Sequence, residues 1–189
     1  MAYRTSEKGE SMSAPGNVQR LSVGAKDDWR TPPDIFAAIQ KRYNVTYTLD
    51  VAASDLNHLT PLYYTGPCIG EGSCNCGLCA SWGTEDGTAW CNNPYLLNRE
   101  FSNKAISEAR RGNLSTLLVP AATDTRWWAD LFVQSSLVVN LTGRLRFLHP
   151  ETGLPSRNNT IGSTLFFTTE IAVTRPEVEV WDWKKNLSR

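Results

Sequence analysis

The fold is organised around one stretch of the chain, Thr88-Ala89-Trp90-Cys91-Asn92-Asn93-Pro94-Tyr95. Its apolar first half predicts a short strand, and the Asn-Asn-Pro that follows predicts a rigid polar turn. In open α/β sheets, ligands bind beyond the carboxyl ends of the strands, so a turn at this place is a candidate active-site loop. The alternative interpretation is an ordinary Asn/Pro surface turn.

The groups offered by this turn suit an aromatic amino group. Asn92 supplies an amide oxygen that can accept a hydrogen bond, and the main-chain carbonyl of Asn93 supplies a second acceptor. Tyr95 supplies a ring face on which a planar base can stack. Two acceptors beside a stacking surface favour a site that holds an exocyclic amino group.

Length and composition favour one globular domain. The chain has 189 residues, of which 41% are hydrophobic and 20% charged, as is ordinary for a soluble domain with a real core. We expect a flexible arm at residues 1–26, which are rich in Ser, Gly and charge, and a single domain at 27–189. No apolar run is long enough to cross a membrane and the start has no signal-peptide pattern, so we expect a cytoplasmic protein without a membrane partner.

The formal net charge of zero is not typical of a tight nucleic-acid binder. Any contact with DNA therefore has to come from local basic residues. The candidates are four arginines: Arg126, Arg144, Arg146 and Arg157. A solvated surface is the alternative interpretation of each of them.

The residues around the turn predict an alternation of helices and strands. Periodicity and apolar runs place them at 32–43 (helix), 46–51 (strand), 98–112 (helix), 114–119 (buried strand) and 136–141 (strand). Thr31 is expected to cap the first helix and Asp50 to end the first strand, while Thr123 or Asp124 is expected to cap a further helix. Strand, helix and strand after the turn predict a parallel crossover, and therefore an α/β fold.

The last third of the chain predicts an antiparallel pair. Residues 143–147 alternate between polar and apolar, and 163–168 would pair with them as a late hairpin across the polar loop 149–162, which could reach DNA. The two histidines, His58 and His149, have no matching partner pattern. We assign neither of them a catalytic role.

A cysteine-rich loop at about 66–82 interrupts this pattern. Only about 40 residues separate Asp50 from Asn92, which leaves room for two βα units at most and predicts a reduced sheet with a long irregular loop. Four cysteines in twelve residues could supply a tetrahedral sulfur shell for structural zinc: Cys68, Cys74, Cys76 and Cys79. Free thiols in an exposed loop are the alternative, since disulfides are not expected in a reducing cytoplasm. Cys91 is expected to be a buried thiol.

The Asn-x-Pro-Tyr of the turn resembles the [Asp/Asn]-Pro-Pro-[Tyr/Phe] signature of S-adenosylmethionine-dependent amino methyltransferases. The resemblance implies that Asn92, Asn93, Pro94 and Tyr95 are the catalytic residues: the first side chain and the second carbonyl hold the target NH2, and the aromatic ring stacks on the flipped base. Asn93 departs from the signature, because a proline is expected there. The substitution keeps the carbonyl and loses the fixed φ of proline.

Four blocks in order resemble the phage-type DNA N6-adenine methyltransferase family, often called Dam-like. They are Trp29-x-Thr31-Pro32-Pro33, Leu49-Asp50-Val51-Ala52-Ala53, Trp90-Cys91-Asn92-x-Pro94-Tyr95 and Pro120-Ala121-x-Thr123-Asp124-Thr125-Arg126-Trp127. The resemblance implies a reduced Rossmann-like methyltransferase sheet, double-stranded DNA as partner and a bacterial host cell. It also implies S-adenosylmethionine as cofactor, bound by Trp29, Thr31, Pro32, Asp50, Ala52 and Ala53.

Two other functions remain as alternatives. The Asn-x-Pro-Tyr turn also occurs in enzymes that methylate amino groups of RNA or glutamine in proteins. From a different class, the change at Asn93 and the cysteine loop would suit a zinc-bearing DNA-binding protein with impaired catalysis. That protein would bind DNA without turning over S-adenosylmethionine.

Overall fold

The computed structural model describes residues 29–65, 75–85, 87–149, 152–156 and 160–187. Its strands are β1 (Tyr47–Ala53), β2 (Leu62–Thr65), β3 (Thr88–Cys91), β4 (Ser115–Pro120), β5 (Ser135–Leu141), β6 (Ser163–Thr168) and β7 (Glu177–Trp181). Its helices are α1 (Pro33–Tyr43), the short 3-10 helix η1 (Tyr95–Leu97), α2 (Asn98–Ala109), α3 (Arg126–Val133) and α4 (Lys184–Leu187).

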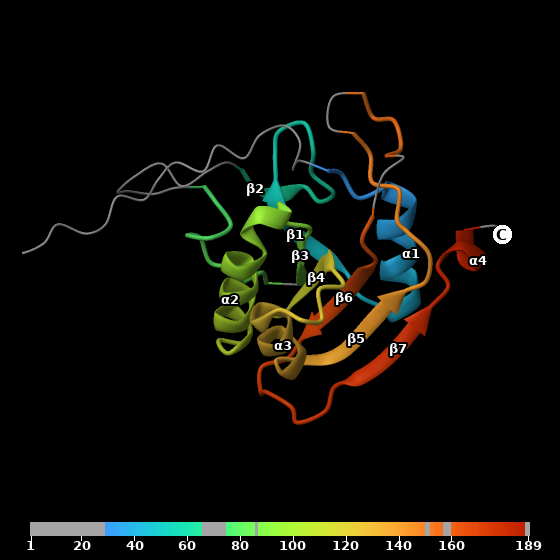
Figure 1. Ribbon diagram of the computed structural model, residues 1–189. Coiled ribbons are helices and arrows are strands. Elements are labelled where there is room, and N and C mark those ends of the chain that lie inside the picture. Colours follow the sequence, from blue (N-terminus) through green and yellow to red (C-terminus); the bar gives the residue numbers. More distant parts are fainter. Residues whose placement is uncertain (1–28, 66–74, 86, 150–151, 157–159, 188–189) are drawn as a thin grey trace, which may run out of the picture.

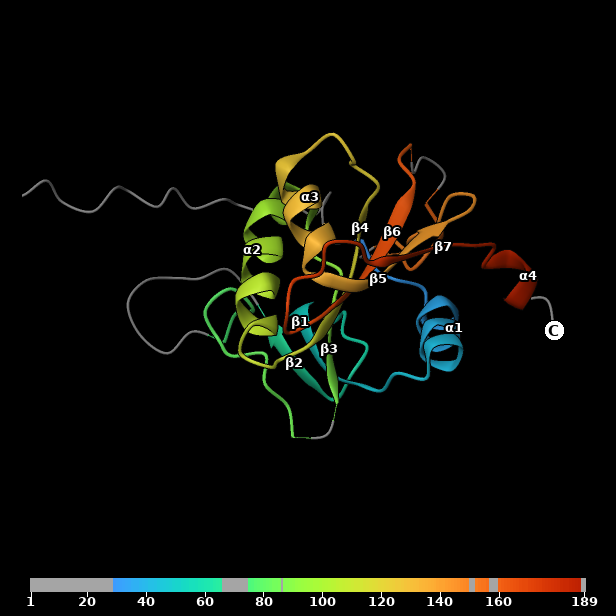
Figure 2. The ribbon, with the colours of Figure 1, turned by 90° about the horizontal axis from the view of Figure 1, so that it is seen from below.

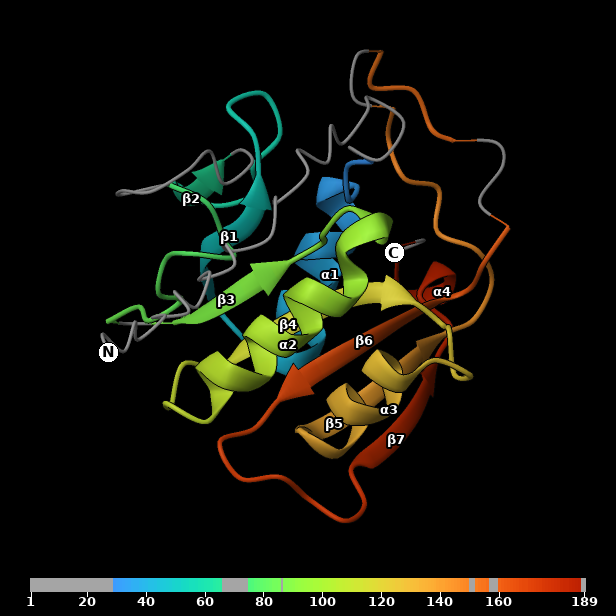
Figure 3. The ribbon, with the colours of Figure 1, turned by 60° about the vertical axis from the view of Figure 1, so that its left-hand side comes forward.

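The strands form one seven-stranded sheet in the order β2-β1-β3-β4-β6-β5-β7 (Figure 3). β1 is parallel to both β2 and β3, and β3 is parallel to β4. β6 runs antiparallel to its two neighbours, β4 and β5, and β7 is parallel to β5. The carboxyl ends of β1, β3 and β4 therefore meet at one edge of the sheet, together with the amino end of β6.

Helices cover both faces of the sheet, with α2 and α3 on one side and α1 on the other (Figure 2). On the first side, Phe101 of α2 and Leu131 of α3 belong to one buried apolar cluster with strand residues such as Phe166. On the other side, Ile35 and Ile39 of α1 belong to a second cluster. Apolar residues three and four apart give each helix one buried stripe, which explains why it packs on a sheet face.

The α/β prediction is confirmed, and so are several elements close to their predicted limits. β3 and β4 are parallel and joined through α2, as the strand-helix-strand pattern predicts. β4 is buried along its whole length, which fits a central strand covered on both faces. These elements were readable because each has a local pattern of its own.

The partner predicted for 163–168 is wrong, although β6 does pair antiparallel with β5, the strand before it in the chain. Residues 143–147 are not a strand, and β6 pairs instead with β4 and β5. The alternation in 143–147 has another cause: Leu145 and Phe147 are buried while Arg144 and Arg146 are exposed along an extended segment outside the sheet. β7 and α4, which had not been predicted, complete the far end of the chain.

Three local expectations are also corrected. Helix α1 begins at Pro33 after Pro32, and no side chain caps it, so Thr31 is not its cap. Helix α3 follows Thr125, rather than Thr123 or Asp124, and the Thr125 hydroxyl donates to the Ala122 carbonyl. β1 continues past Asp50 to Ala53, with an irregularity in its pairing to β2 between the two residues.

The connection between β2 and β3 has no helix in its described part. Residues 75–85 return the chain across the α2 face of the sheet, starting from a hydrogen bond of the Thr65 N–H to the Asn75 carbonyl. Trp82 is 1% exposed, belongs to the same cluster as Phe101 and donates its ring N–H to the Gly77 carbonyl. The expected long irregular loop is thus confirmed for this part.

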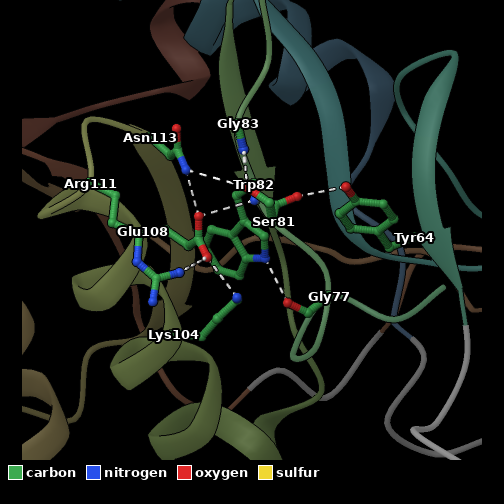
Figure 4. A network of polar contacts seen from close by, with 9 residues as sticks. All are labelled: Tyr64, Gly77, Ser81, Trp82, Gly83, Lys104, Glu108, Arg111 and Asn113. Atoms are coloured by element: carbon green, nitrogen blue, oxygen red, sulfur yellow. Dashed lines mark hydrogen bonds and ion pairs between the residues drawn. The ribbon is translucent and has the colours of Figure 1, made fainter. Parts of the chain in front are cut away.

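A buried carboxylate fixes the end of that connection to α2 (Figure 4). Glu108 is 0% exposed and accepts hydrogen bonds from the Trp82 N–H, from Lys104 and from Asn113. Arg111 adds an ion pair at 3.4 Å. Burial pushes the pKa of Glu108 upward, but these hydrogen bonds outweigh it and hold the pKa below its ordinary value.

None of the helices in the described residues has the length and apolar character required to cross a membrane. The arm predicted at 1–26 lies outside the described residues.

Candidate active site

The turn after β3 lies at the edge of the sheet where the carboxyl ends of β1, β3 and β4 meet. It is held from below by Trp90, which is 0% exposed and packs against Phe36 of α1 and Tyr47 of β1, each with ring centroids 5.2 Å away. Aromatic contacts of this kind restrict a strand end strongly because the rings fit in few orientations. The polar residues that follow are therefore presented from a rigid base.

Asn92 has a defined orientation in this turn. Its Nδ2 donates to the Trp29 carbonyl at 3.0 Å. A carbonyl only accepts, so this contact fixes which end of the amide is the nitrogen. Among the described residues, no hydrogen bond to the Asn92 Oδ1 accompanies this contact.

The Asn93 side chain points the other way, into the protein. It is 3% exposed, and its Nδ2 donates to the Pro94 carbonyl and to Asn98 Oδ1, both at 2.9 Å. Its Oδ1 accepts from the Cys91 thiol at 3.7 Å. Cys91 is buried as expected, and burial raises its thiol pKa well above the ordinary value, so the thiol remains a donor.

Tyr95 begins η1 directly after Pro94 and is half-buried. Its ring lies edge-on to Phe147, with centroids 6.4 Å apart. Burial raises the pKa of the Tyr95 phenol to about 12, so the ring is neutral at physiological pH. A neutral ring braced on one edge and half-exposed can serve as a stacking surface.

A second segment is fastened to the same place. Arg30 and Leu148 exchange two backbone hydrogen bonds, of 3.0 and 2.8 Å. The Trp29 ring meets the His149 ring edge-on at 5.7 Å. The residues before α1 and those leading away from β5 therefore lie side by side, as Figure 1 shows for the blue and orange parts of the ribbon. Through Asn92 and Tyr95, both segments are tied to the turn.

Asp50 lies on the neighbouring strand, paired with Trp90. It is 4% exposed, and backbone N–H groups occupy both of its oxygens: Ala52 donates to Oδ1 at 3.3 Å and Leu59 donates to Oδ2 at 3.1 Å. Burial raises the pKa of Asp50 to about 6, although these hydrogen bonds act in the opposite direction. The carboxylate thus shapes the chain that leaves β1.

The remaining residues predicted to hold a cofactor lie close in the chain to Trp29 or to Asp50. Thr31 is 3% exposed, and its hydroxyl has no hydrogen-bond partner in the described part of the chain. Pro32 precedes α1, and the small, partly buried Ala52 and Ala53 end β1. This buried hydroxyl lies two residues along the chain from the Trp29 carbonyl that binds Asn92.

Three of the four predicted DNA-contacting arginines are described. Arg126 is exposed at the first turn of α3, beyond the carboxyl end of β4. Arg144 and Arg146 are exposed on the segment that leads to Leu148. Arg157 lies outside the described residues.

The predicted zinc site finds no support. Cys76 is disulfide-bonded, which contradicts both its role as a thiolate ligand and the expectation that disulfides are absent. In the described ranges no three His, Cys, Asp or Glu side chains are grouped so that they could hold a metal. Cys79 is exposed, while Cys68 and Cys74 lie outside the described residues.

Three residues at this site were missed or undervalued in the sequence. Phe147 was assigned to a strand, yet its ring contacts Tyr95. His149 packs on Trp29, although nothing in its neighbours in the sequence indicates this. Asn98 was taken only as the start of a helix, and its side chain binds Asn93. The signal for Asn98 was present, since Asn is favoured at helix starts for its side-chain bonds.

The comparisons with known proteins point in one direction. Residues 19–186 match the family model described as DNA N-6-adenine-methyltransferase (Dam). A protein of Escherichia phage T1 named DNA N-6-adenine-methyltransferase is 29% identical over 161 residues, which is 77% of this chain and 64% of the relative. A protein of the same name from Haemophilus phage HP1 (strain HP1c1) is 26% identical over 141 residues, 71% of this chain and 73% of the relative. This chain thus spans a little less than two thirds of the phage T1 protein's length. Since the family model covers nearly the whole sequence, the chain belongs to the DNA N-6-adenine-methyltransferase (Dam) family.

Proposed function

We propose that this protein transfers a methyl group from S-adenosylmethionine to the N6 amino group of adenine in double-stranded DNA. One observation carries the proposal: Asn92 is held through its Nδ2 by the Trp29 carbonyl at the carboxyl edge of the sheet, three residues before the half-buried Tyr95 in the same turn. The family membership supports the same activity.

The chemistry explains why acceptors are needed. The lone pair of the adenine amino group is delocalised into the ring, so the nitrogen is a poor nucleophile. The Asn92 Oδ1 and the Asn93 carbonyl would each accept one amino hydrogen and favour the pyramidal nitrogen that develops in the transition state. No general base with a shifted pKa is needed at N6, in agreement with the absence of a histidine in the turn.

S-adenosylmethionine, when bound, supplies an electrophilic methyl group. The residues present fit such a cofactor: the orphaned Thr31 hydroxyl can bond its polar end, and the small Ala52 and Ala53 let it approach the backbone. Asp50 acts on this site by fixing the chain after β1. Trp29 positions Asn92 through its carbonyl and thereby connects the two halves of the site.

The substrate has to leave the duplex to reach the turn. Bases that undergo chemistry are extruded from the stack, and Tyr95 would stack on the extruded adenine. Arg126, Arg144 and Arg146 would contact phosphates around it. We propose that residues 27–189 form one domain with a reduced Rossmann-like methyltransferase sheet. The protein would act in the cytoplasm of a bacterial host.

The direct test is an assay with labelled S-adenosylmethionine. The purified protein is incubated with unmethylated duplex DNA, with RNA and with a protein extract, and the nucleic acids are digested to nucleosides. Label in N6-methyldeoxyadenosine is expected, and Asn92→Ala should remove it. The matched control is Asn113→Ala, which removes another hydrogen-bonded amide at the opposite end of β4.

Other outcomes would overturn the proposal in identifiable ways. Label found only in RNA or in protein would assign a different substrate to the same turn. Binding of DNA without transfer of label would identify a DNA-binding protein with impaired catalysis. Metal analysis of the same sample tests the zinc prediction.

A further inference from the structure

Asn93 stands where the methyltransferase signature has a proline, and its side chain makes contacts that no proline could make. Both ends of the amide are used inside the protein: the two Nδ2 hydrogens go to the Pro94 carbonyl and to Asn98 Oδ1, and Oδ1 accepts from Cys91. These partners lie before the turn, within it and at the first residue of α2. One buried side chain therefore joins three parts of the active-site loop.

We propose that the Asn93 side chain is a positioning residue that replaces the constraint of the missing proline and so aims the Asn93 carbonyl at the amino group of the target base. This inference rests on the proposed function, because it concerns the acceptor that holds the second amino hydrogen. It assigns the side chain a task distinct from that of its own carbonyl.

The physical argument starts from the backbone. Proline fixes φ at about −65°, whereas Asn leaves it free, and the following Pro94 restricts Asn93 only to the broad extended region. The direction of the carbonyl between the two residues follows from these dihedral angles. The Asn93 side chain bonds Cys91 before the Asn93–Pro94 peptide, and Pro94 and Asn98 after it. These bonds restrict the direction of the Asn93 carbonyl without a proline ring.

The bond to Asn98 ties the turn to a helix. Asn98 is 8% exposed and is the first residue of α2, directly after the N-cap Leu97. Its Oδ1 accepts from Asn93. The helix start is thereby coupled to the turn, and α2 itself is anchored in the core by Phe101 and Ala105.

A return to proline should be tolerated at this position. Proline would remove the Asn93 N–H, which donates to the buried Cys91 sulfur. Sulfur is a weak acceptor, so little is lost with this bond. The proline ring would restore the fixed φ while losing the three side-chain contacts. Alanine would lose those contacts and restore nothing. Comparison of Asn93→Pro with Asn93→Ala therefore separates a loss of positioning from a simple loss of packing.

The test measures kcat and KM for DNA methylation in the full-length protein, with melting temperatures alongside. Asn93→Ala should lower kcat by about ten- to a hundredfold, with both KM values changed by less than about threefold. Asn93→Pro should recover most of that loss, even if its melting temperature is no higher than that of the alanine variant. Equal kcat in the alanine variant and the wild type, or a proline variant as slow as the alanine variant, would overturn the inference.

Asn98 provides a second test in case Asn93→Ala does not fold. Asn98→Asp keeps the acceptor for Asn93 and should keep most of kcat, whereas Asn98→Ala should lower it as Asn93→Ala does. In the Asn93→Pro background Asn98→Ala should cost little more, since the contact is already gone. Similar kcat for the two Asn98 variants would contradict the inference. If the wild type methylates DNA and Asn92→Ala abolishes it while these variants have no effect, only this inference fails; a wild type without transfer overturns the proposed function as well.

Discussion

Asn93 and Glu108 each hold an irregular part of the chain against α2, but they do so with different chemistry. Asn93 is a neutral amide in the turn after β3, and its side chain has three partners, Cys91, Pro94 and Asn98. Glu108 is a buried charge surrounded by Lys104, Arg111, Asn113 and the Trp82 N–H. The first arrangement belongs to the turn that we propose as the active site, whereas the carboxylate of the second is surrounded by protein partners, which suits a purely structural role.

Removal of the buried Glu108 carboxylate is expected to have the largest effect, and the effect is on stability. Glu108→Ala leaves Lys104 half-enclosed and the Trp82 N–H without its acceptor, so the free energy of unfolding should fall by about 3–5 kcal/mol. Urea unfolding measures it. Arg111→Ala is the control: this side chain is 65% exposed and should cost at most about 1 kcal/mol. If kcat per folded molecule also fell more than a few-fold, Glu108 would not be purely structural.

Removal of the Asn92 acceptor should lower activity strongly and stability only slightly, the reverse of what is expected for Glu108. Asn92→Ala is expected to lower kcat by about 10²- to 10³-fold, equivalent to about 2.7–4 kcal/mol, because one preorganised group at the reacting nitrogen is lost. The melting temperature should change by no more than a few degrees, since Asn92 is only partly buried. Activity assays and thermal unfolding of the same sample separate the two quantities. A large loss of stability would mean that Asn92, like Glu108, has a structural role.

The pH dependence of stability should differ in sign between the two buried carboxyl groups. The pKa of Asp50 is raised to about 6 in the folded protein, above its ordinary value of 3.8, so the folded state binds more protons between these values. Its contribution is present below pH 3.8 and is lost as the pH rises through about 6, by up to about 3 kcal/mol. Glu108 has a lowered pKa, so its contribution is present above pH 4.5 and is lost on further acidification.

Urea unfolding at several pH values between about 4 and 7 tests this contrast. Asp50→Asn should flatten the fall in stability through this window, because the neutral side chain does not titrate. An unchanged slope in the variant would show that Asp50 titrates normally in the folded protein.

The smallest expected effect concerns the close packing of the connection between β2 and β3. A Cβ at Gly77 would lie 1.9 Å from the Val51 carbonyl oxygen, so Gly77→Ala has to displace backbone and should cost about 1–3 kcal/mol. At Gly83 the added Cβ would meet only the flexible end of Asn113, at 3.0 Å, and alanine should cost less. Thermal unfolding compares the two. An equal loss of stability in the two variants would mean that the backbone near Val51 moves easily to make room for the added Cβ.

The sequence predicted what depends on residue type and local pattern. Helix α2 and strand β4 were predicted from periodicity and an apolar run, because each such signal lies within a few consecutive residues. The roles of Asn92 and Tyr95 rest on their side-chain chemistry and stay predictions. The pairing of β6 with β4 and β5 depends on residues far apart in the chain, so the alternation at 143–147 was taken for its partner strand.

The contacts of the site itself were beyond local patterns. The hydrogen bond from Asn92 to the Trp29 carbonyl joins residues 63 positions apart, and the ring contact of Tyr95 with Phe147 is likewise long-range. The interior contacts of the Asn93 side chain include Asn98, five residues further on, and no rule about a single position connects the two.

The position of β6 has a consequence for how the chain is made. Because β6 lies between β4 and β5, the two earlier strands cannot become part of one sheet until residue 168 has left the ribosome. Until then β4, buried along its whole length in the finished protein, presents an unpaired apolar edge. Nascent chains that stall in the loop before Ser163 should therefore be the species that aggregates and depends most on chaperones during synthesis.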